Sequence, residues 1–173
     1  YKRQGVIKLD ELKAAIRPTT IMISVMFANN EIGTIQPIKE IGEIAKEHDI
    51  IFHTDAVQAY GHVPINVDEY HIDMLSASGH KINGPKGIGI MYLRNSVKIG
   101  PFIHGGAQER NRRAGTHNVP GIVGFGKATE IAKETMAERS AYETKLRDRL
   151  IEGLTAIPNS RLNGHLSLIH ISE

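Results

Sequence analysis

The stretch LSASGHKINGPKGIGI, at residues 75–90, places Lys81 directly after Ser78 and His80 and before a run of glycines. A lysine that only carries a surface charge needs no such surroundings. In a confined site of low dielectric, the pKa of a lysine amine falls, and the neutral amine is a nucleophile toward aldehydes. The stretch therefore predicts a reactive amine at Lys81.

Other polar side chains follow two neighbouring apolar runs. Asn30 comes after the run at 20–28, and Asp55 and Gln58 come after the run at 50–54. In sheets of parallel strands, functional groups gather just beyond the carboxyl ends of the strands. We therefore expect these three residues to lie at one edge of a sheet, close to Lys81.

An aldehyde cofactor such as pyridoxal phosphate would use this set of groups. The lysine would form a Schiff base with the aldehyde, and the carboxylate of Asp55 would keep the pyridine nitrogen protonated. Asn30 and Gln58 could contact the ring oxygen. A small hydroxyl and an imidazole suit the phosphate, and the stretch supplies them as Ser78 and His80.

The elements that must position these residues alternate along the chain. The hydrophobic pattern predicts helices at 9–16, at 37–48 with Pro37 in the first position, and from about 120 to 157. In the second helix, Ile38, Ile41, Ile44, Ala45 and His48 fall on one face. Apolar runs predict strands at 20–28, 50–55, 72–78 and 87–93. Strands that are apolar on both faces and alternate with helices indicate an α/β fold with a mostly parallel sheet.

Composition narrows the function classes. The 173 residues include 21 basic and 19 acidic side chains, a balance that argues against nucleic-acid binding. The chain has no cysteine, which excludes disulfides, thiolate metal sites and a cysteine nucleophile within these residues, and we expect no metal site. No apolar run is long enough to span a membrane and the first residues contain no signal-peptide core, so the expected location is cytoplasmic.

The segment GIVGFGKA, at residues 121–128, suggests a different function. It matches the start of a phosphate-binding P-loop, G-x-x-x-x-G-K, but Ala128 stands where that motif needs Ser or Thr to hold magnesium. It also does not follow a buried strand and continues into a helical pattern. A nucleotide hydrolase is therefore disfavoured.

The motifs together resemble one known family. The runs VMFANNEIGTIQPIKEIGEIA, HTDAVQAYG, SASGHKINGPKGIGIMY and HGGAQERNRRAGTHNVPGIVG occur in this order. They are similar to cysteine desulfurases of the nitrogen-fixation and iron–sulfur-cluster type. Those enzymes are class V aminotransferase-like proteins with the fold-type I architecture of pyridoxal phosphate enzymes. The match extends over residues 5–165, and the NNEIG motif is specific to this type.

The resemblance implies a role for each residue. Lys81 would form the Schiff base, Asp55 would pair with the pyridinium nitrogen, and Asn30 and Gln58 would contact the ring oxygen. Thr116, in the RRAGT motif, would reach the phosphate of the cofactor in the other subunit of a homodimer. Ser78 and His80 would bind the phosphate in their own subunit. The family converts L-cysteine to L-alanine, passes the sulfur on as a persulfide, and works with iron–sulfur scaffold proteins and sulfur carriers.

Departures from the family indicate a fragment. Residues 1–118 resemble part of the large cofactor-binding domain, and residues 119–165 resemble the connecting helix and the start of the small domain. The resemblance gives no equivalent of the sulfur-accepting cysteine, so we expect the chain alone to be inactive. Residues 166–173, LSLIHISE, do not fit the family and are hypothesised to be non-native. Two alternatives stay open: a related selenocysteine lyase or aminotransferase-like enzyme, and an inactive truncated binding domain.

Overall fold

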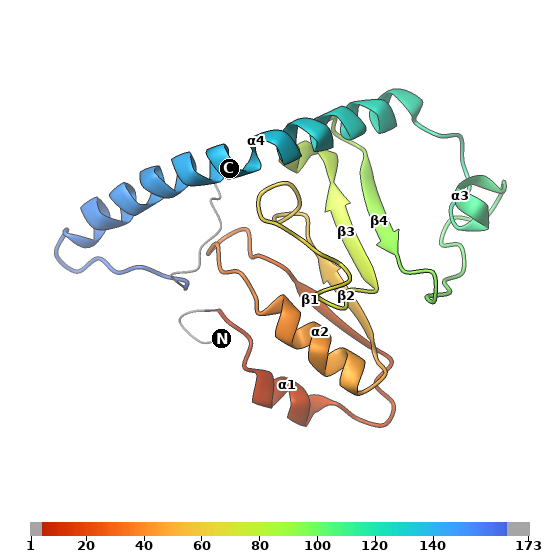
Figure 1. Ribbon diagram of the computed structural model, residues 1–173, viewed down its shortest axis with the longest axis horizontal. Helices are drawn as coiled ribbons and strands as arrows, with labels where there is room; N and C mark the ends of the chain where they lie inside the picture. Colours follow the sequence, from red (N-terminus) through yellow and green to blue (C-terminus); the bar gives the residue numbers. More distant parts are fainter. Residues whose placement is uncertain (1–4, 166–173) are drawn as a thin grey trace.

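The computed structural model describes residues 5–165, and its centre is a four-stranded sheet (Figure 1). The strands are β1 (Met22–Met26), β2 (Ile51–Asp55), β3 (Met74–Ser78) and β4 (Gly89–Leu93), and they lie in that order across the sheet. The first three strands are parallel, and β4 runs antiparallel to β3. The predicted α/β class with a mostly parallel sheet is confirmed. Compared with the predicted ranges, β1 is four residues shorter, β2 is one residue shorter, and β3 and β4 are each two residues shorter.

One face of the sheet carries the hydrophobic core. Helix α2 (Ile38–Glu47) buries Ile38, Ile41 and Ala45 against the sheet, where Phe52 of β2 is fully buried. The shorter helix α1 (Leu9–Ala15) packs against α2 (Figure 1). The isoleucine spacing thus predicted the buried face of α2 correctly.

Two details at the ends of α2 differ from the prediction. His48 is the exposed C-cap residue and does not belong to the buried face. Pro37 is the N-cap residue and not the first helical residue. Its side chain makes no capping bond, and its ring fixes a backbone angle that suits entry into a helix.

The opposite face of the sheet carries both apolar and polar side chains, so the expectation of strands that are apolar on both faces was wrong in part. Met22, Ile51, Met74 and Met91 share this face with polar residues. The ring of His53 in β2 lies between two hydroxyls, with Nδ1 2.8 Å from Ser24 Oγ in β1 and Nε2 3.0 Å from Ser76 Oγ in β3. This polar row crosses three strands. Its groups satisfy one another, which is why polar side chains can occupy a partly buried sheet face.

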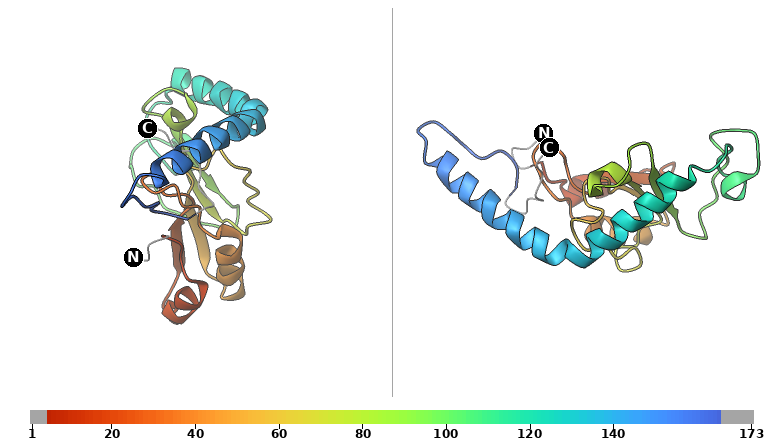
Figure 2. Two further views of the ribbon diagram at one scale, coloured as in Figure 1. Left: turned by 90° about the vertical axis from the view of Figure 1, so that its left-hand side faces the viewer. Right: turned by 90° about the horizontal axis from the view of Figure 1, so that it is seen from above.

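A long helix lies across one end of the sheet. Helix α4 (Val119–Thr155) begins at Asn118, whose side-chain oxygen accepts a hydrogen bond from the backbone N–H of Gly121. Figures 1 and 2 show that α4 crosses the end at which β3 finishes and then extends well beyond the sheet. No helix in the described part of the chain is long and apolar enough to cross a membrane.

Two short elements were not predicted. The 3₁₀ turn η1 (Gly79–Ile82) follows β3 directly, and the single helical turn α3 (Gln108–Asn111) lies between β4 and α4. In α3, Glu109, Arg110 and Asn111 all have positive φ angles. The hypothesis about residues 166–173 falls outside the described residues, and the division into two domains stays a prediction.

Candidate active site

The carboxyl ends of the three parallel strands bring most of the predicted site residues to one edge of the sheet. Asp55 is the last residue of β2 and is paired with Ser76 of β3, two residues before Ser78. Strand spacing and rise place the Cα atoms of Asp55 and Ser78 roughly 8 Å apart. One small heteroaromatic ring with its substituents can bridge this distance.

Asp55 and Ser78 also share a face of the sheet. In β2 the buried Phe52 and Thr54 alternate with His53 and Asp55, and in β3 the buried Leu75 and Ala77 alternate with Ser76 and Ser78. Side chains two residues apart in a strand point the same way. Asp55 and Ser78 therefore point to the face that carries His53 and Ser76, away from α2.

The Asp55 carboxylate is held in part by its own loop. Its Oδ1 accepts a hydrogen bond of 3.0 Å from the backbone N–H of Val57, and its other oxygen accepts none from the described residues. The same loop carries Gln58, which is 9% exposed and makes no side-chain hydrogen bond to the described part of the chain. Neither amide atom of Gln58 is fully buried without a partner among the described residues, so both reach the surface and are open to a ligand.

Lys81 lies in a tight turn that follows β3, which we call the lysine turn (residues 79–84). The turn closes because the backbone N–H of Gly84 donates to the Gly79 carbonyl at 2.8 Å. A Cβ atom on Gly84 would come within 2.8 Å of that same oxygen, so this position requires glycine. Lys81 itself is half-buried.

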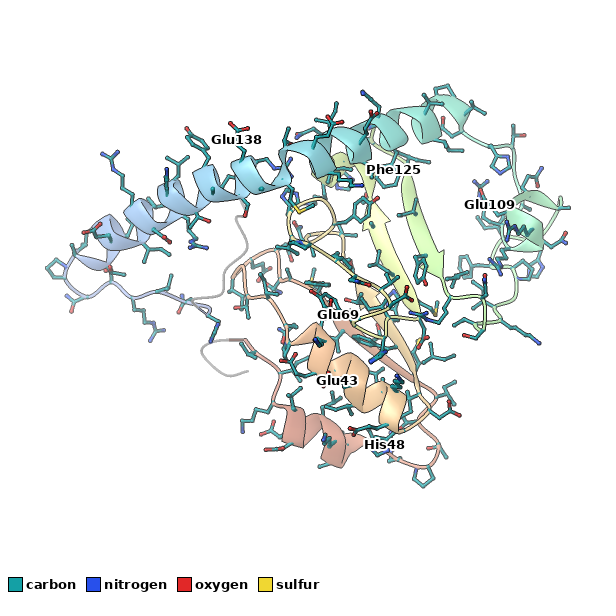
Figure 3. All side chains as sticks on the ribbon, in the orientation of Figure 1. Glu43, His48, Glu69, Glu109, Phe125 and Glu138 are labelled. Carbon is teal, nitrogen blue, oxygen red and sulfur yellow. The ribbon has the colours of Figure 1, made fainter. Side chains whose placement is uncertain are left out.

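Helix α4 packs against the lysine turn. Ile82 of the turn is buried with Phe125, Ala128 and Ala132 of α4 in a second, smaller core cluster. Figure 3 labels Phe125 on the side of α4 that faces the sheet, and its ring lies 6.0 Å from that of Tyr60. Residues 121–128 are therefore helical and packed, which confirms that the P-loop motif is not a phosphate-binding loop here.

The hydroxyl and imidazole predicted to bind phosphate are paired with each other. Ser78 Oγ lies 2.7 Å from His80 Nδ1, and His80 is exposed, so both groups are accessible to a ligand beside Lys81. Burial lowers the pKa of the nearby His53, and the negative charge of Asp55 partly opposes this shift. The neutral imidazole of His53 fits its place between two hydroxyls.

The other two predicted residues lie in exposed segments. Asn30 follows β1 in a turn that is closed by the side chain of Asn29, which accepts hydrogen bonds from the backbone N–H groups of Glu31 and Ile32. Thr116 is exposed in the segment between α3 and α4, which projects from one side of the sheet (Figure 1). Among the described residues, no hydrogen bond joins Thr116 to the other six predicted site residues.

One contact at this edge, between His62 and the backbone of Lys81, was not predicted from the sequence. His62 Nε2 lies 3.0 Å from the backbone oxygen of Lys81, although 19 residues separate the two. The GH pair at 61–62 gave no periodic or motif signal. Only the fold brings this side chain to the lysine turn.

The residues present suit pyridoxal phosphate. The donor set contains an amine, a carboxylate with one oxygen available, an amide that is nearly buried without a partner, and a hydroxyl–imidazole pair. Each matches one chemical group of that cofactor: aldehyde, pyridine nitrogen, ring oxygen and phosphate. The gathering of these complementary groups at one edge of the sheet is the observation that favours a bound ligand over a merely structural cluster.

Comparisons with known proteins point the same way. Residues 1–170 match the family described as "Aminotransferase class-V". "Cysteine desulfurase IscS" of Methanosarcina thermophila is 66% identical over 163 residues, which are 94% of this chain and 40% of that protein. The protein of the same name from Clostridium botulinum (strain Hall) is 57% identical over 162 residues, which are 93% of this chain and 41% of that protein. The chain thus spans about two-fifths of the length of these relatives.

Solved structures share the fold. A structure described as "NIFS-LIKE PROTEIN" matches with a TM-score of 0.91 and 43% identity, over 97% of this chain and 46% of that one. A structure described as "SspA in complex with cysteine" matches with a TM-score of 0.73 and 51% identity, over 75% of this chain and 38% of that one.

Proposed function

Because this chain belongs to the class V aminotransferase family, we propose that it forms the lysine-bearing part of a pyridoxal phosphate-dependent cysteine desulfurase. The observation that carries the proposal is the convergence of Asp55, Gln58 and the lysine turn at the carboxyl edge of three parallel strands. The relatives named cysteine desulfurase and the structure described with cysteine support L-cysteine as the substrate of the full-length enzyme.

Each residue has a proposed task in binding. When bound, the cofactor supplies an aldehyde and a ring that accepts electrons from the substrate. The Lys81 amine would hold the aldehyde end of the cofactor and would move a proton to or from the substrate. The open carboxylate oxygen of Asp55 would hold the pyridine nitrogen, and Gln58 and Asn30 would hold the ring oxygen. Ser78 and His80 would hold the phosphate.

The site is proposed to be completed by other parts of the protein. Thr116 lies in an exposed segment that projects from the sheet, which supports its proposed contact with the cofactor of a second copy in a homodimer. The sulfur acceptor is proposed to be a cysteine elsewhere in the full-length enzyme, since these 173 residues contain none. Iron–sulfur scaffold proteins and sulfur carriers are the proposed partners of that enzyme.

The test is cofactor binding by the full-length enzyme that contains this chain. We expect pyridoxal phosphate to give a visible absorption band that Lys81→Ala abolishes, while Lys86→Ala, which removes an exposed lysine of the same stretch, leaves it intact. Asp55→Asn is expected to weaken cofactor binding at least about tenfold, because a charge-assisted hydrogen bond is lost. An unchanged band in Lys81→Ala would refute the proposal.

Production of L-alanine from L-cysteine tests the reaction itself. The full-length enzyme should form both L-alanine and sulfide in the presence of a thiol reductant, and Lys81→Ala should not. Alanine release from selenocysteine but not from cysteine would instead assign the enzyme to the selenocysteine lyases.

A further inference from the structure

His62 donates a hydrogen bond to the backbone of Lys81. A carbonyl oxygen only accepts, so the Nε2 atom of His62, 3.0 Å from the Lys81 oxygen, must carry the proton. The turn's own hydrogen bonds from Asn83 and Gly84 both end on the Gly79 carbonyl. The lysine carbonyl is therefore held from outside the turn, by a side chain that is itself half-buried.

The residue before His62 packs against the same turn. A Cβ atom at Gly61 would lie 2.7 Å from Cγ2 of Ile82 and 3.1 Å from Cβ of Ala132, and Gly61 has a φ angle of +77°. Its carbonyl accepts a hydrogen bond from the guanidinium of Arg139 in α4. Residues 61–62 thus lie between the lysine turn and α4, in contact with both.

His62 lies in the loop that follows β2, and the same loop begins directly after Asp55 and contains Gln58. Backbone hydrogen bonds run from Tyr60 to Ala56 at 2.8 Å and from His62 to Ala59 at 3.0 Å, so the loop is a succession of tight turns. His62 is consequently fixed relative to Asp55 and Gln58. Its bond to Lys81 links the loop after β2 to the loop after β3.

We infer that His62 is a positioning residue that sets the placement of the Lys81 amine relative to Asp55 and Gln58. Beyond Ser78 the lysine turn is held by the bond from the Gly79 N–H to the Ile88 carbonyl and by the packing of Ile82 on α4. Neither of these contacts fixes the turn relative to the loop that follows β2. The His62 bond and the Gly61 packing supply that connection. This inference rests on the proposed function, because it assigns His62 a role toward the proposed cofactor amine.

The test compares two substitutions at His62 in the full-length enzyme. In His62→Gln, the amide nitrogen can occupy the place of Nε2 and donate to the same carbonyl, whereas His62→Leu keeps a similar volume without a donor. We expect His62→Leu to bind pyridoxal phosphate about three- to tenfold more weakly, the usual effect of one lost hydrogen bond, and His62→Gln to recover most of the affinity.

A second readout does not depend on the cofactor. In the cofactor-free protein, the rate at which acetic anhydride acetylates Lys81 is measured by mass spectrometry relative to Lys86 in the same digest. His62→Leu should change this ratio at least about threefold, and His62→Gln should leave it close to the wild-type value. Arg139→Leu, which removes the bond to Gly61 from the side of α4, should act in the same direction and serves if His62→Leu does not fold.

The outcomes separate this inference from the proposed function. If Lys81→Ala abolishes the absorption band while His62→Leu and Arg139→Leu change neither affinity nor acetylation ratio, His62 has no positioning role and the proposed function stands. If the band persists in Lys81→Ala, the proposed function is wrong and the inference falls with it. If His62→Gln is as defective as His62→Leu, the side-chain hydrogen bond is not what positions the lysine.

Discussion

Replacing Gly42 by alanine tests how closely α2 packs against the connection between β2 and β3 at Tyr70. A Cβ atom at Gly42 would lie 1.9 Å from the carbonyl oxygen of Tyr70 and 3.3 Å from Cδ1 of Phe52. Ordinary contacts of a Cβ atom begin at 3.4 Å, so the helix and the backbone at residue 70 would have to separate by about 1.5 Å, the difference between 3.4 and 1.9 Å. The obstacle is backbone and cannot rotate away.

The magnitude follows from two opposing contributions. Overpacking of a filled core costs about 1–3 kcal/mol, and a clash with backbone belongs at or above the upper end of that range. The higher helix propensity of alanine compared with glycine stabilises the folded state by up to about 1 kcal/mol. We therefore expect Gly42→Ala to lower the free energy of unfolding by at least about 2 kcal/mol.

Gly126 provides the matched control. It also lies inside a helix, α4, but nothing comes within 4 Å of the position its Cβ would take. Gly126→Ala should raise the free energy of unfolding by about 0.5–1 kcal/mol, because only the helix preference changes. Urea unfolding of the full-length protein, followed by circular dichroism, measures both variants. A Gly42→Ala midpoint equal to or above that of wild type would show that α2 is not packed as described.

Three further outcomes are expected. Burial lowers the pKa of His53, so the unfolded chain takes up more protons than the folded chain below pH 6.5. The free energy of unfolding should therefore be fully present above that pH and fall on acidification. His53→Gln should flatten this dependence in urea midpoints measured between about pH 7.5 and 5.5. Thr54→Val should stabilise the protein by about 1 kcal/mol in the same assay, since the Thr54 hydroxyl is buried without a partner among residues 5–165; a loss would mean that the hydroxyl is bonded. Arg94→Met should lower the free energy of unfolding by about 1–3 kcal/mol, and Arg94→Lys should lower it nearly as much. The reason is that the guanidinium binds two carboxylates and two carbonyls together, those of Asp68, Asp73, Val67 and Ile72. Full stability in Arg94→Lys would contradict this.

The order of the elements could be predicted because their signals are local. The isoleucines of α2 recur at helical spacing, and the β-branched runs of β1 and β2 are bounded by polar residues, so both the elements and the shared edge of Asp55 and Lys81 followed from the chain alone. The lysine turn did not, because its shape depends on a close approach between Gly79 and Gly84.

Two features of the site depend on partners that are distant in sequence. The polar row exists because Ser24, His53 and Ser76 meet across three strands, and no single strand shows that its hydroxyl or imidazole will be satisfied. The polar residues at every second position, His53 and Asp55 in FHTD and Ser76 and Ser78 in MLSAS, were the available sign of polar groups on that face. The bond from His62 to Lys81 has no comparable sign, since it needs the fold to bring two loops together.

Helix α4 should not unwind uniformly. Its buried residues, Gly121, Phe125, Ala128 and Ala132, all lie in its first half, and among the described residues the last side chain that ties it to the sheet-end loops is Arg139. None of the remaining sixteen residues is buried, and a helix of that length is marginal in water on its own. In this chain, amide exchange with deuterated solvent should therefore be fast from Thr155 inward and slow down near Arg139. Fraying would therefore stop near Arg139, before it reaches the part of α4 that packs against the lysine turn.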